Sequence, residues 1–270
     1  MALMQVSFLS LSLGREVHFH AVVPIERFGP DPARAEKPEP FRTLYLLHGY
    51  RGTSTDWIHY SRIKELAHKH RIAIIMPSGE NHFYLDHVEK HEWHGHFIGR
   101  ELVDFTRTLF PLSSRREDTW IGGLSMGGYG AIRNGLKYAE NFGRIIALSS
   151  ALITYQIADA SPDYRDMVAD YAYYRSVFGD LTQLPGSDKD PEALVRQLRS
   201  ADIDLPDIYM ACGTDDFLLD VNRRFHHFLE EERVQHVYIE AEGQHNWDFW
   251  NLHIERALDY YCGKPKGGAS

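Results

Sequence analysis

The chain has 270 residues, 43% of them apolar, and a formal net charge of −9 at pH 7. This length and apolar content suffice for a single domain, 1–270, with a substantial core, and no linker-like or repetitive stretch divides it. The negative charge argues against a nucleic-acid partner, because phosphate binding needs a basic surface. We expect neither a secretory signal nor a membrane span. The two cysteines, Cys212 and Cys262, are typical of reduced thiols in a cytoplasmic protein, and Cys212 is interpreted as a core residue rather than a nucleophile.

The predicted elements begin with an antiparallel hairpin, at 6–13 and 16–24, in which apolar and polar residues alternate on either side of Gly14. A loop rich in proline and charge follows at 29–40. Almost wholly apolar strands then alternate with helices, as expected of strands covered on both faces. In chain order these elements are the strand 43–47, the helix 54–70, the strand 72–76, the helix 91–110, the strand 119–124, a helix after residue 125, the strands 144–148 and 207–212, the helix 221–232, the strand 237–240 and the helix 248–261. The alternation predicts an α/β fold with a doubly wound, mainly parallel sheet, whose binding sites form beyond the carboxyl ends of the strands.

The most specific motif is Gly-Leu-Ser-Met-Gly at 123–127, between the strand 119–124 and an amphipathic helix. A G-x-S-x-G motif at a strand-to-helix turn is typical of the nucleophile elbow of α/β-hydrolases. This turn is so tight that large side chains beside the serine would collide with the neighbouring strand and helix, and Gly123 and Gly127 leave the room that is needed. The motif predicts Ser125 as a nucleophile.

An acid and a histidine follow later strands, where partners of the nucleophile should lie. The loops after the last two predicted strands contain Asp215, Asp216 and His245. This is the hydrolase order Ser, Asp, His, in which the histidine accepts the serine proton and the acid orients the imidazole. We favour Asp216 over Asp215, because the triad acid usually lies three residues after the glycine that ends the strand and precedes an apolar residue. We interpret Asp220 and Asp248, which lie within or at the start of predicted helices, as surface or capping charges.

Two backbone N–H groups are expected to bind the negative oxygen of the tetrahedral intermediate. One belongs to Met126, which follows the nucleophile, and the other to Tyr50, in the His-Gly-Tyr sequence after the strand 43–47. The ring of Tyr50 is also a candidate wall of the acyl pocket. His48 is interpreted as a brace for this loop, held by side-chain hydrogen bonds, rather than as a second base.

Histidines cluster in the segment that includes the start of the predicted helix 91–110. The cluster consists of His82, His87, His91, His94 and His96. His87, His91 and His94 have the spacing of one helical face, which invites a metal site. However, His-Glu-Trp-His at 91–94 is not the H-E-x-x-H motif, and no acidic third ligand is obviously placed. We therefore predict a solvated or partly packed histidine-rich face and no metal.

Aromatic residues near the predicted site have two interpretations that the sequence leaves open. Trp247, Phe249 and Trp250 follow the predicted base and either line the site or pack the last helix against the sheet, with Trp247 the better candidate for substrate binding. The segment 151–205 is too long for a simple crossover and is predicted to be a cap-like insertion that sets substrate choice. Its tyrosines either form a platform for a sugar or aryl group or pack a helix onto the main domain. They are Tyr155, Tyr164, Tyr171, Tyr173 and Tyr174.

Longer stretches of sequence carry a family resemblance. In chain order they are Tyr-Leu-Leu-His-Gly at 45–49, Phe-Pro-Leu-Ser at 110–113, Arg-Glu-Asp at 116–118, Gly-Leu-Ser-Met-Gly-Gly-Tyr-Gly-Ala at 123–131, Phe-Gly-Asp-Leu at 178–181, Cys-Gly-Thr-Asp-Asp-Phe-Leu at 212–218 and His-Asn-Trp-Asp-Phe-Trp at 245–250. With these, the chain resembles the esterase D-type branch of the α/β-hydrolases, and most closely the bacterial tributyrin esterase and acetylesterase group. The resemblance implies a triad of Ser125, Asp216 and His245, with Tyr50 and Met126 as oxyanion donors.

The resemblance also implies an activity: a serine carboxylesterase that hydrolyses short-chain acyl esters, such as acetyl and butyryl esters or acetylated sugars, through an acyl-enzyme intermediate. The reaction needs only water and the triad, so no cofactor is expected. The expected partner is a small-molecule ester, and a homo-oligomer stays open. The alternatives within the family are a feruloyl or cinnamoyl-type esterase and an S-formylglutathione hydrolase. A hydrolase-fold binding protein without catalysis is disfavoured by the intact triad residues and elbow glycines.

Overall fold

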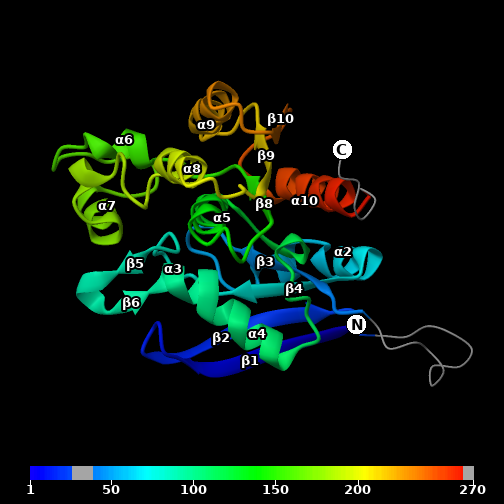
Figure 1. The fold of residues 1–270 in the computed structure, drawn as a ribbon. Helices are drawn as coiled ribbons and strands as arrows, with labels where there is room; N and C mark the ends of the chain where they lie inside the picture. The colour runs from blue at the N-terminus through cyan, green and yellow to red at the C-terminus, as the bar shows by residue number, and fades with distance from the viewer. Residues whose placement is uncertain (26–38, 264–270) are drawn as a thin grey trace, which may run out of the picture.

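The structure is a computed structural model that describes residues 1–25 and 39–263, so the predicted loop 29–40 lies outside the described residues except for its last two. An eight-stranded sheet crosses the molecule in the order β1-β2-β4-β3-β7-β8-β9-β10 (Figure 1). Its strands are β1 (Ala2–Ser10), β2 (Arg15–Val23), β3 (Arg42–Leu47), β4 (Ile72–Pro77), β7 (Thr119–Leu124), β8 (Arg144–Leu148), β9 (Asp207–Gly213) and β10 (His236–Ala241). β1 pairs antiparallel with β2, and β2 with β4, while the pairs from β4 to β10 are parallel. The predicted fold, a doubly wound, mainly parallel sheet with an N-terminal antiparallel hairpin, is confirmed.

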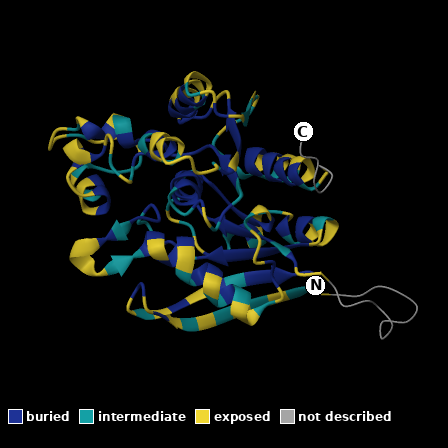
Figure 2. Cartoon of the chain, viewed as in Figure 1, coloured by how far each residue is buried: buried dark blue, intermediate teal, exposed yellow. Residues whose placement is uncertain are grey.

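Helices cover both faces of this sheet (Figure 1). One face carries α1 (Asp56–Tyr60), α2 (Ile63–His70) and α10 (Trp247–Gly263), and the core cluster of the other face includes residues of α4 (Leu102–Leu109), α5 (Met126–Lys137), α6 (Thr154–Ala158), α7 (Tyr171–Phe178), α8 (Pro191–Ser200) and α9 (Leu219–Glu231). The core is divided in two because successive residues of a strand point to opposite faces, and Figure 2 shows the central strands as the most deeply buried part. No helix in residues 1–25 and 39–263 has both the length and the apolarity needed to cross a bilayer.

The predicted helix 54–70 is instead two helices, α1 and α2, separated by an extended Ser61. The break is occupied by Asn251 from α10. Its amide nitrogen donates to the Tyr60 carbonyl at 2.8 Å, and its amide oxygen accepts from the Arg62 N–H at 3.3 Å. The two helices therefore separate where a distant side chain satisfies backbone groups that a continuous helix would pair internally.

The predicted helix 91–110 begins later, at His94. Residues before it form a small two-stranded ribbon, β5 (Asp86–His87) and β6 (Glu92–Trp93), in which His91 has a φ of 55°. The helical run continues from α3 (His94–His96) through a π-helical turn at Phe97–Glu101 into α4. The prediction that His87, His91 and His94 share a helical face is therefore wrong, because His87 and His91 precede the helix.

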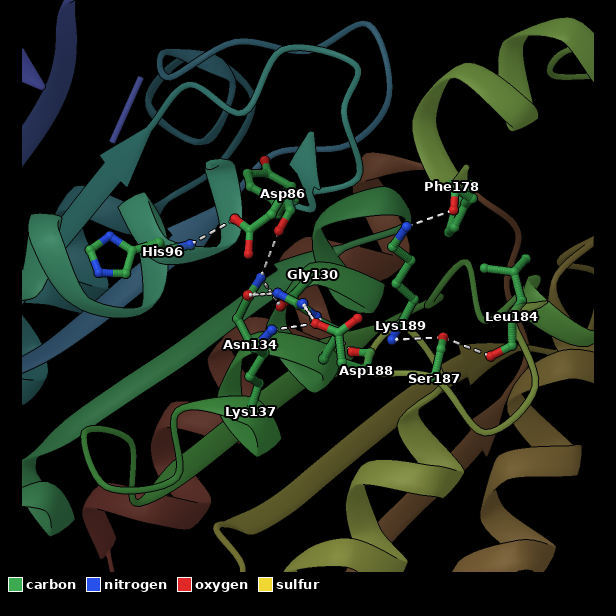
Figure 3. Close-up of polar contacts among 12 residues, drawn as sticks. Asp86, His96, Gly130, Asn134, Lys137, Phe178, Leu184, Ser187, Asp188 and Lys189 are labelled. Carbon is green, nitrogen blue, oxygen red and sulfur yellow. Dashed lines mark hydrogen bonds and ion pairs between the residues drawn. The ribbon is translucent and has the colours of Figure 1, made fainter. Parts of the chain in front are cut away.

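Polar contacts join α5 to the segment 151–205, as Figure 3 shows. Arg133 Nη2 donates to Asp188 Oδ2 at 2.6 Å, and Arg133 Nε donates to the Asp188 carbonyl at 3.0 Å. Lys137 pairs with the same carboxylate, and the Tyr129 hydroxyl donates to the Lys189 carbonyl at 2.7 Å. Burial raises the pKa of Asp188, but Arg133 and Lys137 outweigh it and hold that pKa below its ordinary value of 3.8. The helix that begins beside Ser125 thus also anchors the segment 151–205.

Asp188→Ala is expected to lower the free energy of unfolding by about 2–3 kcal/mol, because the Arg133 side chain, 1% exposed, would keep a buried charge without its carboxylate. Urea unfolding followed by circular dichroism measures the loss. The stabilisation of the fold that the charged Asp188 carboxylate provides is fully present above its ordinary pKa of 3.8. It is lost as the pH falls through the lower pKa that Asp188 has in the folded protein. Asp163→Ala, which removes an exposed carboxylate of the same segment, is the control and should cost less than about 0.5 kcal/mol. Equal losses in the two variants would contradict the assigned role of Asp188.

Candidate active site

Ser125 lies at the turn between β7 and α5, with φ 54° and ψ −119°. Its N–H donates to the Leu148 carbonyl of the neighbouring strand at 2.9 Å, which holds this strained conformation in place. Space explains the flanking glycines. A Cβ on Gly123 would lie 2.4 Å from the Gly127 carbonyl oxygen, and a Cβ on Gly127 would lie 2.6 Å from the His48 carbonyl oxygen. The local sequence therefore meets the steric demand of this sharp turn.

The side chains of Ser125, His245 and Asp216 form one chain of hydrogen bonds. His245 Nε2 lies 3.0 Å from Ser125 Oγ, and His245 Nδ1 lies 2.9 Å and 3.0 Å from the two carboxylate oxygens of Asp216. The three residues follow β7, β10 and β9, whose carboxyl ends meet at one edge of the sheet. Because the carboxylate accepts from Nδ1–H, Nε2 is left to accept the serine proton.

Asp216 differs from the other candidate carboxylates in burial and contacts. It is 5% exposed and also accepts a hydrogen bond from the Leu218 N–H at 2.9 Å. Burial tends to raise the pKa of Asp216, but the hydrogen bond from His245 and those from its other neighbours hold that pKa below its ordinary value. The other three candidates are exposed, namely Asp215, Asp220 and Asp248. The structure therefore brings Asp216 to His245 in a charged form.

The loop after β3 approaches the nucleophile closely. A Cβ on Gly49 would lie 2.7 Å from Leu124 Cδ1 and 3.6 Å from Ser125 Cβ, so a glycine allows this approach. Met126 is the first residue of α5, and the first N–H groups of a helix have no partner within it. Tyr50 and Met126 line the same cavity as Ser125. Both predicted oxyanion residues are thus located beside the serine.

His48 is buried and uses both ring nitrogens to hold this loop. Its Nδ1 donates to the Gly49 carbonyl at 2.7 Å, and its Nε2 accepts from the Gly79 N–H at 2.9 Å. Burial lowers the pKa of His48, so the ring is neutral at pH 7. The Tyr84 hydroxyl adds a hydrogen bond to the His48 carbonyl at 2.9 Å. Neither nitrogen is left to act as a second base.

A cavity of about 740 Å³ opens at Ser125. Trp247 both lines it and packs edge-on against Trp57, with ring centroids 5.1 Å apart, so the two interpretations of Trp247 hold together. Trp250 also lines the cavity, whereas Phe249 is buried against His253. The segment 151–205 supplies a further part of the lining, namely Ala151, Ile153, Gln156, Tyr164, Asp166, Met167, Val168 and Tyr174. Both interpretations of the tyrosines therefore hold for different residues. Tyr164 and Tyr174 line the cavity, whereas Tyr155 and Tyr173 form hydrogen bonds to other parts of the fold.

Several residues that line the cavity were not predicted from the sequence, among them Phe217, Phe83 and Asp166. Phe217 is 49% exposed, and its ring centroid lies 4.6 Å from that of His245. Its place directly after Asp216 was the available signal. Phe83 and Asp166 come from segments far from any catalytic motif, and no local pattern marks them.

Known proteins similar to this chain include esterases and serine hydrolases. The model of the family described as "Putative esterase" matches residues 12–261. An acetyl esterase of Caldicellulosiruptor saccharolyticus is 51% identical over 260 residues, which cover 96% of this chain and 98% of that protein. Among solved structures, FphF, a fluorophosphonate-binding serine hydrolase of Staphylococcus aureus, superposes with a TM-score of 0.84 at 26% identity, over 97% of this chain and 99% of that one. The S-formylglutathione hydrolase FrmB of Staphylococcus aureus gives 0.82 at 27% identity, over 97% and 98%.

These matches span nearly the whole chain, and the chain therefore belongs to this esterase family. Its fold is the α/β-hydrolase fold and its activity that of a serine carboxylesterase. The family predicted from the sequence is confirmed.

Proposed function

We propose that the chain hydrolyses short-chain acyl esters, including acetyl and butyryl esters, tributyrin and acetylated sugars, with Ser125 as its nucleophile. His245 is the general base and Asp216 the triad acid. The observation that carries the proposal is the continuous hydrogen-bonded arrangement of these three side chains at a cavity. The acetyl esterase relative, at 51% identity, supports the short acyl group.

The proposed reaction follows from the distances. Ser125 Oγ attacks the ester carbonyl while His245 Nε2, 3.0 Å away, accepts its proton. The N–H groups of Tyr50 and Met126 bind the negative oxygen that develops, and Asp216 stabilises the imidazolium. His245 then gives the proton to the leaving alcohol, and water attacks the acyl-enzyme by the same route in reverse.

The insertion 151–205 is proposed to act as a cap that selects the alcohol. An acetyl group occupies a small part of about 740 Å³, so most of the cavity remains for the rest of the ester. The Asp166 carboxylate lines this space and accepts from the Tyr174 hydroxyl at 2.7 Å, which fixes its orientation. A carboxylate held in place beside Tyr164 suits the hydroxyl groups of a sugar.

The cytoplasm is the proposed compartment, because Cys212 and Cys262 are free thiols. The formation of a homo-oligomer stays a prediction.

A substrate profile tests this function. We expect kcat/KM for p-nitrophenyl acetate and butyrate to exceed that for methyl ferulate by at least about tenfold, because a pocket discriminates by the apolar area and hydrogen bonds that it fits. S-formylglutathione enters the same comparison because a structural relative at 27% identity hydrolyses it. Dominance of methyl ferulate or of S-formylglutathione would overturn the short-chain ester assignment.

A further inference from the structure

A second group of titratable side chains lies where the turn after β4 meets α3. Glu80, His82 and His94 each present one ligand atom, and these three atoms lie within 4.8 Å of one another. The rings of His82 and His94 are tilted by 31° with centroids 4.7 Å apart. None of the three is among the described residues that line the substrate cavity. The group is thus separate from the esterase site.

Three of the four histidine ring nitrogens of this group have no hydrogen-bond partner among the described residues. His94 is completely buried, and in the described part of the chain neither of its ring nitrogens has a hydrogen-bond partner; the same holds for Nδ1 of His82. Folded proteins rarely leave buried polar atoms unpaired, so such atoms require an explanation. An imidazole nitrogen whose lone pair is unused is the atom that a transition-metal ion binds.

We propose that Glu80, His82 and His94 bind a divalent transition-metal ion of the Zn²⁺ class. Two imidazoles and one carboxylate are ligands that Zn²⁺ accepts, with water in the fourth position. Glu80 is 45% exposed, which gives the ion an entrance from solvent. One Glu80 oxygen pairs with Arg15, and the other lies 3.4 Å from His82 Nε2 and faces the histidines. Ligands of tetrahedral Zn²⁺ lie about 3.3 Å apart, so side-chain shifts of about 1 Å close the site.

The sequence placed His82 and His94 in a histidine cluster but did not reveal their grouping with Glu80, because Glu80 and His82 lie in the turn after β4 and His94 begins α3. Glu80 has a φ of 49°, and a carboxylate oxygen of Glu80 lies within 4.8 Å of a ring nitrogen of His94, a proximity that no helical spacing of histidines predicts. The sequence placed no acidic third ligand obviously beside these histidines, and Glu80 is the residue that this proposal adds.

The site lies against the esterase machinery without touching the triad. Asn81, between two of the ligands, accepts from the Arg51 N–H through its amide oxygen at 2.8 Å and from the Tyr173 hydroxyl through its carbonyl at 2.6 Å. Arg51 follows Tyr50, and Tyr173 belongs to α7, which Figure 1 shows on the same side of the molecule as β5, β6 and α3. A bound ion therefore fixes the segment that supports the oxyanion loop and the insertion. Its role is structural.

Titration of the full chain with Zn²⁺ tests the site, by calorimetry after removal of metals with EDTA. We expect one ion bound with a Kd below about 10 µM, and a Tm that rises by about 5 °C at a hundredfold excess over Kd. Glu80→Gln and His82→Asn should each weaken binding at least about tenfold. His227→Asn is the matched control, since His226, His227 and Glu230 form a second group on the surface of α9. There His226 already contacts His236 at 2.7 Å, so His227→Asn should leave the Kd unchanged.

Three results would overturn the proposal: a wild-type Kd above about 100 µM, unchanged binding in both Glu80→Gln and His82→Asn, or loss of binding in His227→Asn. Far-UV circular dichroism checks that the variants are folded. Should one unfold, the visible absorption of Co²⁺ in the wild-type chain decides, because tetrahedral coordination by imidazoles gives intense bands and a hydrated ion does not. This test is independent of the proposed esterase substrates.

Discussion

Ser125→Ala is expected to lower kcat for p-nitrophenyl acetate by about 10⁵-fold while the fold stays intact. The substitution removes the hydroxyl that lies 3.0 Å from His245 Nε2 and leaves the glycines of the turn in place. Adding His245→Ala should cost little more, because the two side chains act as a unit. Steady-state kinetics measures the loss, and a fluorophosphonate probe followed by mass spectrometry measures labelling of the serine.

The control is Ser114→Ala, which alters an exposed serine and should retain full activity and labelling. Full activity in Ser125→Ala, or undiminished labelling of that variant, would remove Ser125 from the proposed mechanism. A matching circular dichroism spectrum excludes unfolding as the cause of a loss.

Asp216→Asn is expected to lower kcat by about 10⁴-fold with little change in stability. The amide can donate to His245 Nδ1, which favours the tautomer with the proton on Nε2, and that nitrogen then cannot accept the serine proton. The substitution also removes the negative charge that stabilises the imidazolium. The neighbouring Asp215 provides the control: it is exposed, and Asp215→Asn should change kcat by less than about twofold. A large loss in Asp215→Asn and a small one in Asp216→Asn would move the triad acid to Asp215.

Much of the sheet could be predicted from sequence because its strands are buried on both faces. The apolar residues of β3, β4 and β7 stand out without any knowledge of neighbouring elements. The turn around Ser125 is equally local, since its glycines are demanded by contacts within a few residues and with the adjacent strand. The positions after β9 and β10 then follow from the rule that parallel strands end at one edge. Local patterns thus located Ser125, Asp216 and His245 as candidates.

Features that depend on distant residues could not be predicted in this way. The break between α1 and α2 is filled by Asn251, which lies far along the chain. The start of the helical run at His94 depends on the β5–β6 ribbon and on the left-handed backbone of His91. Likewise, Phe83 and Asp166 reach the cavity only through the packing of the whole chain.

The anchoring of α5 has a consequence for how this chain can diversify. Arg133 and Lys137 fix the stretch around Asp188, while residues 164–168 at the cavity form a loop between α6 and α7. Lengthening a flexible loop whose ends are held costs only about 0.6 kcal/mol for each doubling of its length. Insertions and deletions in that loop can therefore reshape the pocket during evolution while the nucleophile keeps its geometry. Descendants of one esterase can thus come to hydrolyse esters of other alcohols while the residues that cleave the ester stay unchanged.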